Sequence, residues 1–269
     1  MVEKSTRVPV IMATGENFKQ VTDEIVREAP VTLFLNDEEF ATLICSPGNL
    51  KELAVGFLCS ESILNRQSDL RSITINEEDG LIWAEIAGNP PAAEQFLKRY
   101  ITTCCGRGRA SFYFINDARG ISPVSSDVRI TTRQALSLMT ELESLATLFQ
   151  KTGGAHGAAL CSTKEVILFY EDIGRHNVVD KIFGRCFLEQ TNLEDKIIVF
   201  SGRISSEILI KTAKMGIPII ISRAAPTDLA VNLADELGIT IIGFARENRL
   251  NIYTHSQRVI GSEKNINGL

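Results

Sequence analysis

From Val31 onward, short apolar runs separated by polar turns fill the first half of the chain. Val31–Leu35 and Glu39–Cys45 predict two strands, and the apolar spacing of Lys51–Leu64 predicts a helix. Two more runs, Arg71–Ile75 and Leu81–Ile86, flank a polar turn and predict a further pair of strands. This pattern is typical of a small α+β domain.

The second half opens with a helical pattern over Thr132–Gln150 and then alternates strands with helices. The predicted strands are Val166–Tyr170, Lys196–Phe200, Pro218–Ser222, Ile239–Phe244 and Asn251–Thr254, and the intervening helices begin at Asn177, Ile204 and Pro226. The first four strands are apolar, so we expect them to be buried on both faces of a sheet. Such alternation predicts an α/β layer fold. A polar connection, Ala118–Arg129, places the boundary near residue 130, between domains 1–130 and 131–269.

The composition is that of a globular protein with one large or two modest domains. The 269 residues are 44% hydrophobic and 23% charged, and 28 basic against 33 acidic residues leave a net charge of −5. This balance disfavours a general nucleic-acid or anionic-membrane surface. No apolar run approaches the roughly 20 residues of a membrane span. The N-terminus makes a poor signal peptide, so we expect a cytoplasmic protein.

Arginines cluster directly after the predicted strands of the second half. Ligands of open α/β sheets lie beyond the carboxyl ends of the strands, so these positions are the first candidates for a site. The five arginines are Arg175, Arg203, Arg223, Arg246 and Arg249. Ser201 and Gly202 lead into a helix N-terminus, whose free N–H groups favour anions. The edge therefore predicts a cleft for phosphate or a nucleotide diphosphate.

Common nucleotide and metal motifs are missing. The chain has no G-x-x-x-x-G-K-[ST] loop, and Gly106–Ser111 only approaches G-x-G-x-x-G, so ATP hydrolysis and dinucleotide redox chemistry are disfavoured. Acidic residues around His176 suggest a metal site, but the H-x-E and P-C-x-x-C ligands of zinc deaminases are absent, and we expect no catalytic zinc. His156 and His176 lie in glycine-containing loops, which leaves a structural and a functional role open.

Two of the six cysteines have reactive surroundings. Cys104 and Cys105 stand beside Arg107 and Arg109 in the loop 102–110, and cationic neighbours favour the nucleophilic thiolate. Adjacent Cα atoms are about 3.8 Å apart, less than the roughly 4.4 to 6.8 Å of disulfides, so we expect free thiols. The alternative is one buried and one incidental cysteine. The cysteines expected in the core are Cys45, Cys59, Cys161 and Cys186.

A set of motifs spans much of the chain. They are Gly153–His156, Glu171–Lys181, Ser201–Arg203 and Ala225–Thr227, with Ser46-Pro47, Glu52–Leu58 and Glu61 upstream. Together they resemble the formate dehydrogenase accessory sulfurtransferase (FdhD) family, over residues 28 to 258. The most specific part of the resemblance is the Glu171–Lys181 run.

The resemblance implies a cytoplasmic homodimer that carries sulfur from a cysteine desulfurase to the molybdenum bis(molybdopterin guanine dinucleotide) cofactor of formate dehydrogenase. It also implies a three-layer, cytidine-deaminase-like α/β domain after the smaller α+β domain. By position, Cys105 matches the persulfide cysteine of the family. The residues expected to bind the cofactor, which is cargo, are Phe244, Ala245, Arg246, Glu247, Asn248 and Arg249, with His156, Arg175, His176, Ser201, Arg203 and Ser222.

The cysteine loop departs from the family pattern at one position. Where the family usually has C-G-x-C-G, this chain has Gly108 in place of the second cysteine, and Cys104 precedes Cys105 instead. Two hypotheses follow. The first is a sulfurtransferase that acts through Cys105, with Cys104 as the candidate for the second thiol. The alternative is a chaperone that binds and delivers the cofactor without handling sulfur.

Overall fold

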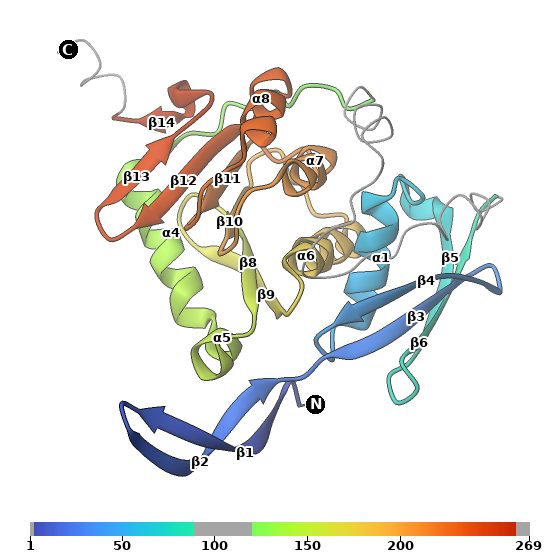
Figure 1. Ribbon diagram of the computed structural model, residues 1–269. Coiled ribbons are helices and arrows are strands. Elements are labelled where there is room, and N and C mark those ends of the chain that lie inside the picture. The colour runs from blue at the N-terminus through green and yellow to red at the C-terminus, as the bar shows by residue number, and fades with distance from the viewer. Residues whose placement is uncertain (1–2, 89–119, 262–269) are drawn as a thin grey trace.

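The computed structural model describes residues 3–88 and 120–261 and shows a mixed α/β protein with several sheets (Figure 1). The cysteine loop 102–110 lies outside the described residues. Within them, no helix is long and apolar enough to cross a membrane.

The first half forms a four-stranded sheet with one long helix against it. Its strand order is β4-β3-β6-β5. The elements are β3 (Ala29–Leu35), β4 (Glu38–Cys45), α1 (Leu50–Ser60), the short 3-10 helix η1 (Gln67–Asp69), β5 (Leu70–Asn76) and β6 (Leu81–Ile86). The four predicted strands are confirmed, and α1 ends earlier than predicted because Ser62 adopts a left-handed backbone with φ of 60°. Alternate residues such as Leu33 and Leu35 are buried against α1.

The second half is built on a six-stranded sheet of order β13-β12-β11-β10-β8-β9. Its strands are β8 (His156–Cys161), β9 (Val166–Asp172), β10 (Ile197–Phe200), β11 (Ile219–Ser222), β12 (Thr240–Arg246) and β13 (Arg249–Ile252). Since β10, β11 and β12 are parallel and both β9 and β10 run antiparallel to β8, four strands point the same way. Their carboxyl ends therefore share one edge of the sheet.

Helices cover both faces of this sheet (Figure 1). They are α4 (Thr132–Leu145), α5 (Thr147–Thr152), α6 (Arg175–Glu189), α7 (Ser206–Lys214) and α8 (Asp228–Glu236). On one face α4 packs through Leu138, Met139 and Leu142, and on the other α6, α7 and α8 share a second apolar core. A short parallel pair, β7 (Ile130–Thr131) with β14 (Val259–Ile260), and η2 (Ser256–Arg258) complete the domain.

Three predictions for the second half were wrong. The predicted helix Thr132–Gln150 is two helices, because Ala146 has a non-helical backbone between α4 and α5. Neither histidine lies in a loop: His156 begins β8, a strand of small buried residues next to the glycines that favoured a loop, and His176 lies in the first turn of α6, which begins directly after Gly174. Strand β9 is an edge strand with partly exposed side chains, so it is not buried on both faces.

The polar connection before the second half packs on that half. The Val124 N–H donates to the Leu237 carbonyl at 2.8 Å, and the Ser126 hydroxyl donates to the Glu194 carbonyl at 2.6 Å. The domain boundary near residue 130 stays a prediction.

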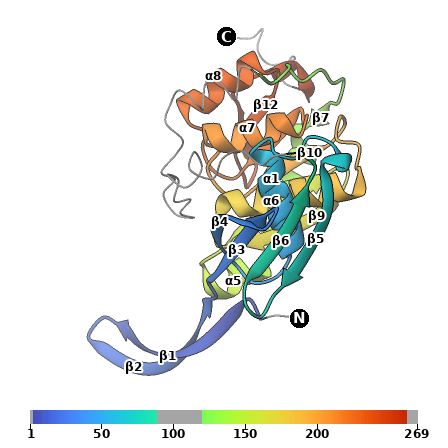
Figure 2. The ribbon, with the colours of Figure 1, turned by 90° about the vertical axis from the view of Figure 1, so that its right-hand side faces the viewer.

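A long N-terminal hairpin was not predicted from the sequence. Strands β1 (Ser5–Thr14) and β2 (Asn17–Val26) pair in unbroken register, and the hairpin extends away from the rest of the molecule (Figures 1 and 2). Its apolar stretch is short and is interrupted by Pro9 and followed by charges, so the pattern predicts no strand. Four of its large apolar side chains are exposed: Ile11, Met12, Phe18 and Ile25.

The two halves meet where α1 lies against α6 (Figures 1 and 2). Gly56 of α1 and Gly184 of α6 are in backbone contact: a Cβ on Gly56 would lie 1.7 Å from the Asp180 carbonyl oxygen, and one on Gly184 would lie 1.9 Å from that of Glu52. Glycine at both positions lets the helix axes come this close. The contact fixes the start of α6, and hence the adjoining sheet edge, against the first half.

Candidate functional site: the carboxyl edge of the six-stranded sheet

The carboxyl edge brings together residues from separate parts of the sequence. His156 begins β8 and pairs in register with Asp172 at the end of β9, so both lie at this edge. Ser201 and Arg203 follow β10, Arg223 follows β11, and Arg246 ends β12. The predicted clustering of these positions at one sheet edge therefore holds in the structure.

Two serines shape the loops at this edge. The Gly157 N–H donates to Ser201 Oγ at 3.0 Å, and the Ser201 N–H donates to the Gly157 carbonyl at 2.9 Å. Ser222 is fully buried, and its hydroxyl donates to the Gly202 carbonyl at 2.7 Å and accepts from the Ala224 N–H at 2.9 Å. Both hydroxyl oxygens accept from backbone N–H groups and so position the loops, but only the Ser222 hydroxyl also donates its proton within the protein.

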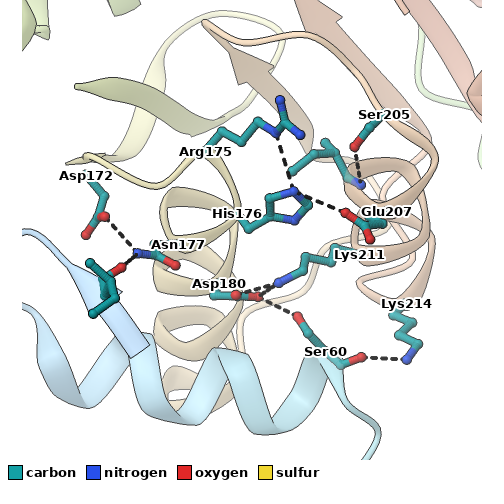
Figure 3. Close-up of polar contacts among 12 residues, drawn as sticks. Ser60, Asp172, Arg175, His176, Asn177, Asp180, Ser205, Glu207, Lys211 and Lys214 are labelled. Atoms are coloured by element: carbon teal, nitrogen blue, oxygen red, sulfur yellow. Dashed lines mark hydrogen bonds and ion pairs between the residues drawn. The ribbon is translucent and has the colours of Figure 1, made fainter. Parts of the chain in front are cut away.

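Arg175 and His176 occupy the first turn of α6, at the mouth of the edge (Figure 3). Arg175 Nε lies 3.4 Å from His176 Nε2, which also lies 3.3 Å from a Glu207 carboxylate oxygen. Burial, with the positive charges of Lys211 and Arg175, lowers the pKa of His176 to about 3. Burial and Arg175 also lower the pKa of His156. Both imidazoles are therefore neutral at pH 7, and each ring presents one donor and one acceptor nitrogen.

Buried side chains of the Glu171–Lys181 run form an internal polar network. Asp172 accepts from the Gly174 N–H at 2.8 Å, from Asn177 Nδ2 at 2.8 Å and from Lys181 Nζ at 2.6 Å, and Lys181 is completely buried. The Ser46 N–H donates to the same carboxylate at 3.1 Å, which ties the first half to the loop before α6. These residues hold Arg175 and His176 in place.

Two further carboxylates of the run also have structural partners. The Asp180 carboxylate pairs with Lys211 and accepts from Ser60 Oγ at 2.6 Å (Figure 3). Burial raises the pKa of Asp180, and the Lys211 charge opposes that shift. Glu171 accepts the N–H groups of Leu148 and Phe149 at 2.9 Å each and so caps α5. None of these side chains is free to bind a ligand, and the described residues contain no cluster of three His, Cys, Asp or Glu side chains suited to a metal ion.

The segment Phe244–Arg249 forms a sharp, exposed turn between β12 and β13. Phe244 and Glu247 have left-handed backbones with φ of 52° and 55°, and the strand register shifts at a bulge before Arg246. The Arg246 guanidinium lies 5.9 Å from the centre of the Phe244 ring. Ala245 is buried, whereas the residues from Arg246 to Arg249, including Glu247 and Asn248, are exposed.

Most of the arginines at this edge have no counter-charge among residues 3–88 and 120–261. Among the residues that the structure describes, no carboxylate lies within ion-pair distance of Arg175, Arg203, Arg246 or Arg249. Arg223 alone of the five is paired, with Glu143 on α4 at 3.0 Å. Uncompensated guanidinium groups on one edge suit a polyanionic ligand such as a diphosphate.

A pocket of about 330 Å³ lies beside this edge on the α4 side of the sheet. His156, Ser201 and Arg223 line it from the strands, and Glu143 and Phe149 line it from α4 and α5. Of these, the sequence pointed to Ser201 and Arg223 because they follow predicted strands, and to His156 because it stands in a glycine-containing motif. Glu143 and Phe149 carried no such signal, because only the fold brings their helices to the edge.

The four described cysteines are buried structural residues. Cys45, Cys59, Cys161 and Cys186 are free thiols within the apolar cores, as predicted. Burial raises the pKa of Cys45, Cys161 and Cys186 to about 12, and it also raises that of Cys59. They remain protonated at neutral pH and are inaccessible to a protein partner.

A sequence profile of the FdhD/NarQ family matches residues 26–260. The chain belongs to this family. A sulfur carrier protein FdhD from Bacillus pumilus is 47% identical over 239 residues, covering 88% of this chain and 91% of the relative. A sulfur carrier protein FdhD from Bacillus subtilis is 44% identical over 242 residues, covering 89% and 92%.

The fold is also that of a solved structure. A crystal structure from Desulfotalea psychrophila, of a protein assigned as a formate dehydrogenase accessory protein, superposes with a TM-score of 0.80. It covers 96% of this chain and 100% of that one at 23% identity, so it supports the fold alone. The FdhD/NarQ match also includes the entire carboxyl edge and its five arginines.

Proposed function

We propose that this FdhD/NarQ family member is a sulfurtransferase that accepts sulfur from a cysteine desulfurase. It passes the sulfur to the molybdenum bis(molybdopterin guanine dinucleotide) cofactor required by formate dehydrogenase. The observation that carries the sulfur step is the burial of four of the six cysteines, with thiol pKa values raised by that burial. Cys104 and Cys105 remain as the candidate carriers, and curated relatives at 44% to 47% identity are sulfur carrier proteins.

In the proposed transfer the Cys105 thiolate attacks the terminal sulfur of the donor's persulfide. The donor's S–S bond breaks, its cysteine leaves as a thiolate, and Cys105 becomes the persulfide, with no net oxidation or reduction. Arg107 and Arg109 lie two and four residues further along, and cationic groups near a thiol stabilise the thiolate. Cys104 is the candidate second thiol, since Gly108 stands where the family usually has one.

The cofactor is proposed to bind as cargo along the carboxyl edge. It carries two diphosphates, and the four arginines that pair with no carboxylate in the described part of the chain are suited to hold them. Two of these arginines, Arg246 and Arg249, belong to the turn Phe244–Arg249, and the other two are Arg175 and Arg203. His156, His176, Ser201 and Ser222 shape the floor of the same edge through the contacts described above.

A homodimer is part of the proposal, with the β1–β2 hairpin as its contact. A two-stranded ribbon alone is marginal in water, yet this one exposes Ile11, Met12 and Phe18. Its charges nearly cancel, two basic residues against three acidic ones between Ser5 and Val26, which suits contact with an identical ribbon. Phe18→Asp is expected to convert a dimer into a folded monomer in analytical ultracentrifugation, whereas Phe149→Asp on α5 is not.

The remaining parts of the proposal follow from the family. We infer a cytoplasmic location shared with the sulfur donor and with formate dehydrogenase, and no nucleic-acid or membrane partner. The sheet with α4 on one face and α6, α7 and α8 on the other supports a cytidine-deaminase-like three-layer domain. No catalytic zinc is proposed.

The second candidate function, cofactor delivery without sulfur handling, is favoured by Gly108, which removes the usual two-cysteine relay. Mass spectrometry separates the two candidates. The chain is incubated with a cysteine desulfurase and cysteine, and the wild type is compared with Cys104→Ala and Cys105→Ala. A reducible gain of one sulfur on Cys105, lost in Cys105→Ala alone, supports the carrier. No gain from a competent desulfurase contradicts it and favours the delivery chaperone.

A further inference from the structure

The four-stranded sheet of the first half has an outer face with a stacked aromatic pair at its centre. The strand register places one residue from each strand in a row across this face, in the order Glu39, Phe34, Trp83 and Thr74. The rings of Phe34 and Trp83 stack with their centroids 5.8 Å apart and their planes at 16°. Trp83 is the only tryptophan of the chain. The centre of the face is therefore aromatic, and its two sides are polar.

The opposite face of this sheet carries the apolar core. Alternate residues such as Leu33 and Ile82 are buried there, and α1 and α6 both pack against the core that they form. Figure 2 shows the sheet in front of these two helices, with its outer face towards the viewer. On that face Phe34 and Trp83 are only partly buried. A partly exposed aromatic centre with polar surroundings is the composition typical of a protein interface.

The outer face and the turns at its two ends are acidic. The strands and hairpin turns of the sheet, residues 29–45 and 70–86, contain seven acidic residues and one basic residue, Arg71. The seven acidic residues are all exposed, and they are Asp37, Glu38, Glu39, Glu77, Glu78, Asp79 and Glu85. None of them forms an ion pair within the described part of the chain. Their negative charge is available to a partner.

This charge decides among the classes of occupant. Nucleic acid and anionic lipid would be repelled by the carboxylates. A second copy of the chain would set the same carboxylates against each other, because a two-fold contact uses one patch on both subunits, and like charges across an interface oppose association. A protein surface that carries lysine and arginine pairs with carboxylates instead, and a guanidinium also stacks on an aromatic ring.

We propose that the outer face of the four-stranded sheet is the docking surface for the cysteine desulfurase, through basic side chains of the donor that pair with the acidic residues and stack on Trp83. The inference rests on the proposed function, which requires a sulfur donor. Strand β6, which carries Trp83 and Glu85, is the last described element before the loop 102–110 in the chain. Helices α1 and α6 separate the face from the six-stranded sheet (Figure 1). A docked donor therefore leaves the carboxyl edge open to the cargo.

Biolayer interferometry with the full chain and a purified cysteine desulfurase tests the contact. The double variant Glu39→Lys with Glu85→Lys is expected to weaken binding about tenfold or more, because it places positive charge opposite the donor's basic groups. Trp83→Ala is expected to weaken binding to a similar extent, as for the loss of a central aromatic anchor. Glu165→Lys with Glu236→Lys, at exposed positions of the second half, changes the net charge equally and is expected to bind like the wild type.

Sulfur loading of Cys105, followed by mass spectrometry, separates this inference from the proposed function. If the Glu39/Glu85 double variant and Trp83→Ala bind the desulfurase and gain sulfur as the wild type does, the docking surface is wrong and the sulfur-carrying function stands. Normal loading with lost activation of formate dehydrogenase would assign the face to the client instead and overturn the donor contact. A wild type that gains no sulfur from a competent desulfurase would overturn both proposals.

Two controls guard the interpretation of a loss of binding. An equal loss in the Glu165/Glu236 double variant would mean that net charge governs the association, which contradicts a contact at this face. Thermal unfolding and GDP binding are expected to be unchanged in the Glu39/Glu85 double variant, because both side chains are exposed and lie outside the carboxyl edge.

Discussion

The α1–α6 junction and the carboxyl edge of the six-stranded sheet both depend on the Glu171–Lys181 run, yet the two regions differ in whether their charged side chains have an oppositely charged partner. At the junction, Asp172, Asp180 and Lys181 are buried and each has an opposite charge as partner. At the edge, four of five arginines have no carboxylate partner among the described residues. The Glu171–Lys181 run, the most specific motif of the sequence, therefore has a largely structural role. Ligand binding is better sought at the carboxyl edge, where the arginine charges are not balanced by described carboxylates.

The largest effect is expected at the glycine contact of the junction. Gly56→Ala inserts a methyl group against the Asp180 backbone, and we expect the free energy of unfolding to fall by about 3 kcal/mol or more. Helix propensity alone predicts a gain of about 1 kcal/mol, so the sign of the change decides between contact and propensity. Urea denaturation measures it, and a stabilised Gly56→Ala would refute the contact.

The buried ion pair comes next. Lys181→Met leaves the Asp172 charge without its cation, and we expect a loss of about 3 to 5 kcal/mol in the free energy of unfolding. Lys196→Met, which breaks an exposed pair with Asp195, is the control and is expected to cost at most about 1 kcal/mol. Equal losses in the two variants would mean that Lys181 is not an architectural residue.

Nucleotide binding tests the carboxyl edge of the six-stranded sheet. Arg246→Ala and Arg249→Ala are expected to weaken GDP binding roughly tenfold each, because one charge-assisted contact is lost, and to leave the unfolding free energy unchanged. Their exposed side chains make this separation of binding from stability feasible. Unchanged GDP affinity in both variants, measured by titration calorimetry, would remove the phosphate assignment of the turn.

At neutral pH the smallest effect is expected from His176, which lies where the two regions meet, and it grows only as the pH falls. Its folded-state pKa of about 3 is below the roughly 6.5 of an unfolded chain. As the pH falls from about 6.5 to about 3, the unfolded state alone binds the proton, so stability falls by up to about 1.4 kcal/mol per pH unit. His176→Gln removes this contribution. Parallel pH profiles of wild type and variant would contradict the assignment.

The sequence predicted the strands that are strongly apolar and the sheet edge where their polar ends meet. It did not predict β8, since His156–Cys161 is made of small residues beside two glycines and becomes a strand only through pairing with β9 and β10. The hairpin β1–β2 was not predicted because its stability does not come from a buried core, which a periodic apolar pattern would reveal. The break at Ala146 depends on a distant cap, Glu171.

The site divides in the same way. The arginines after each strand could be predicted because their position follows from strand direction alone. Glu143 and Phe149 could not be predicted in this way, because residues on α4 and α5 come near the edge only when the folded chain packs these helices beside it. The structural role of Asp172 and Asp180 was equally hidden, since their partners Ser46, Ser60 and Lys211 lie far away in the sequence.

The central claim, that sulfur travels on Cys105 to the cofactor, is tested most directly by maturing formate dehydrogenase. A strain without its own family member is complemented with wild type, Cys105→Ala or Cys186→Ala, and the activity of formate dehydrogenase is measured at equal carrier levels. We expect the wild type and Cys186→Ala, a substitution in the buried core, to restore activity and Cys105→Ala to restore less than about 1% of it, as for the loss of an essential nucleophile. Full activity with Cys105→Ala would contradict the claim.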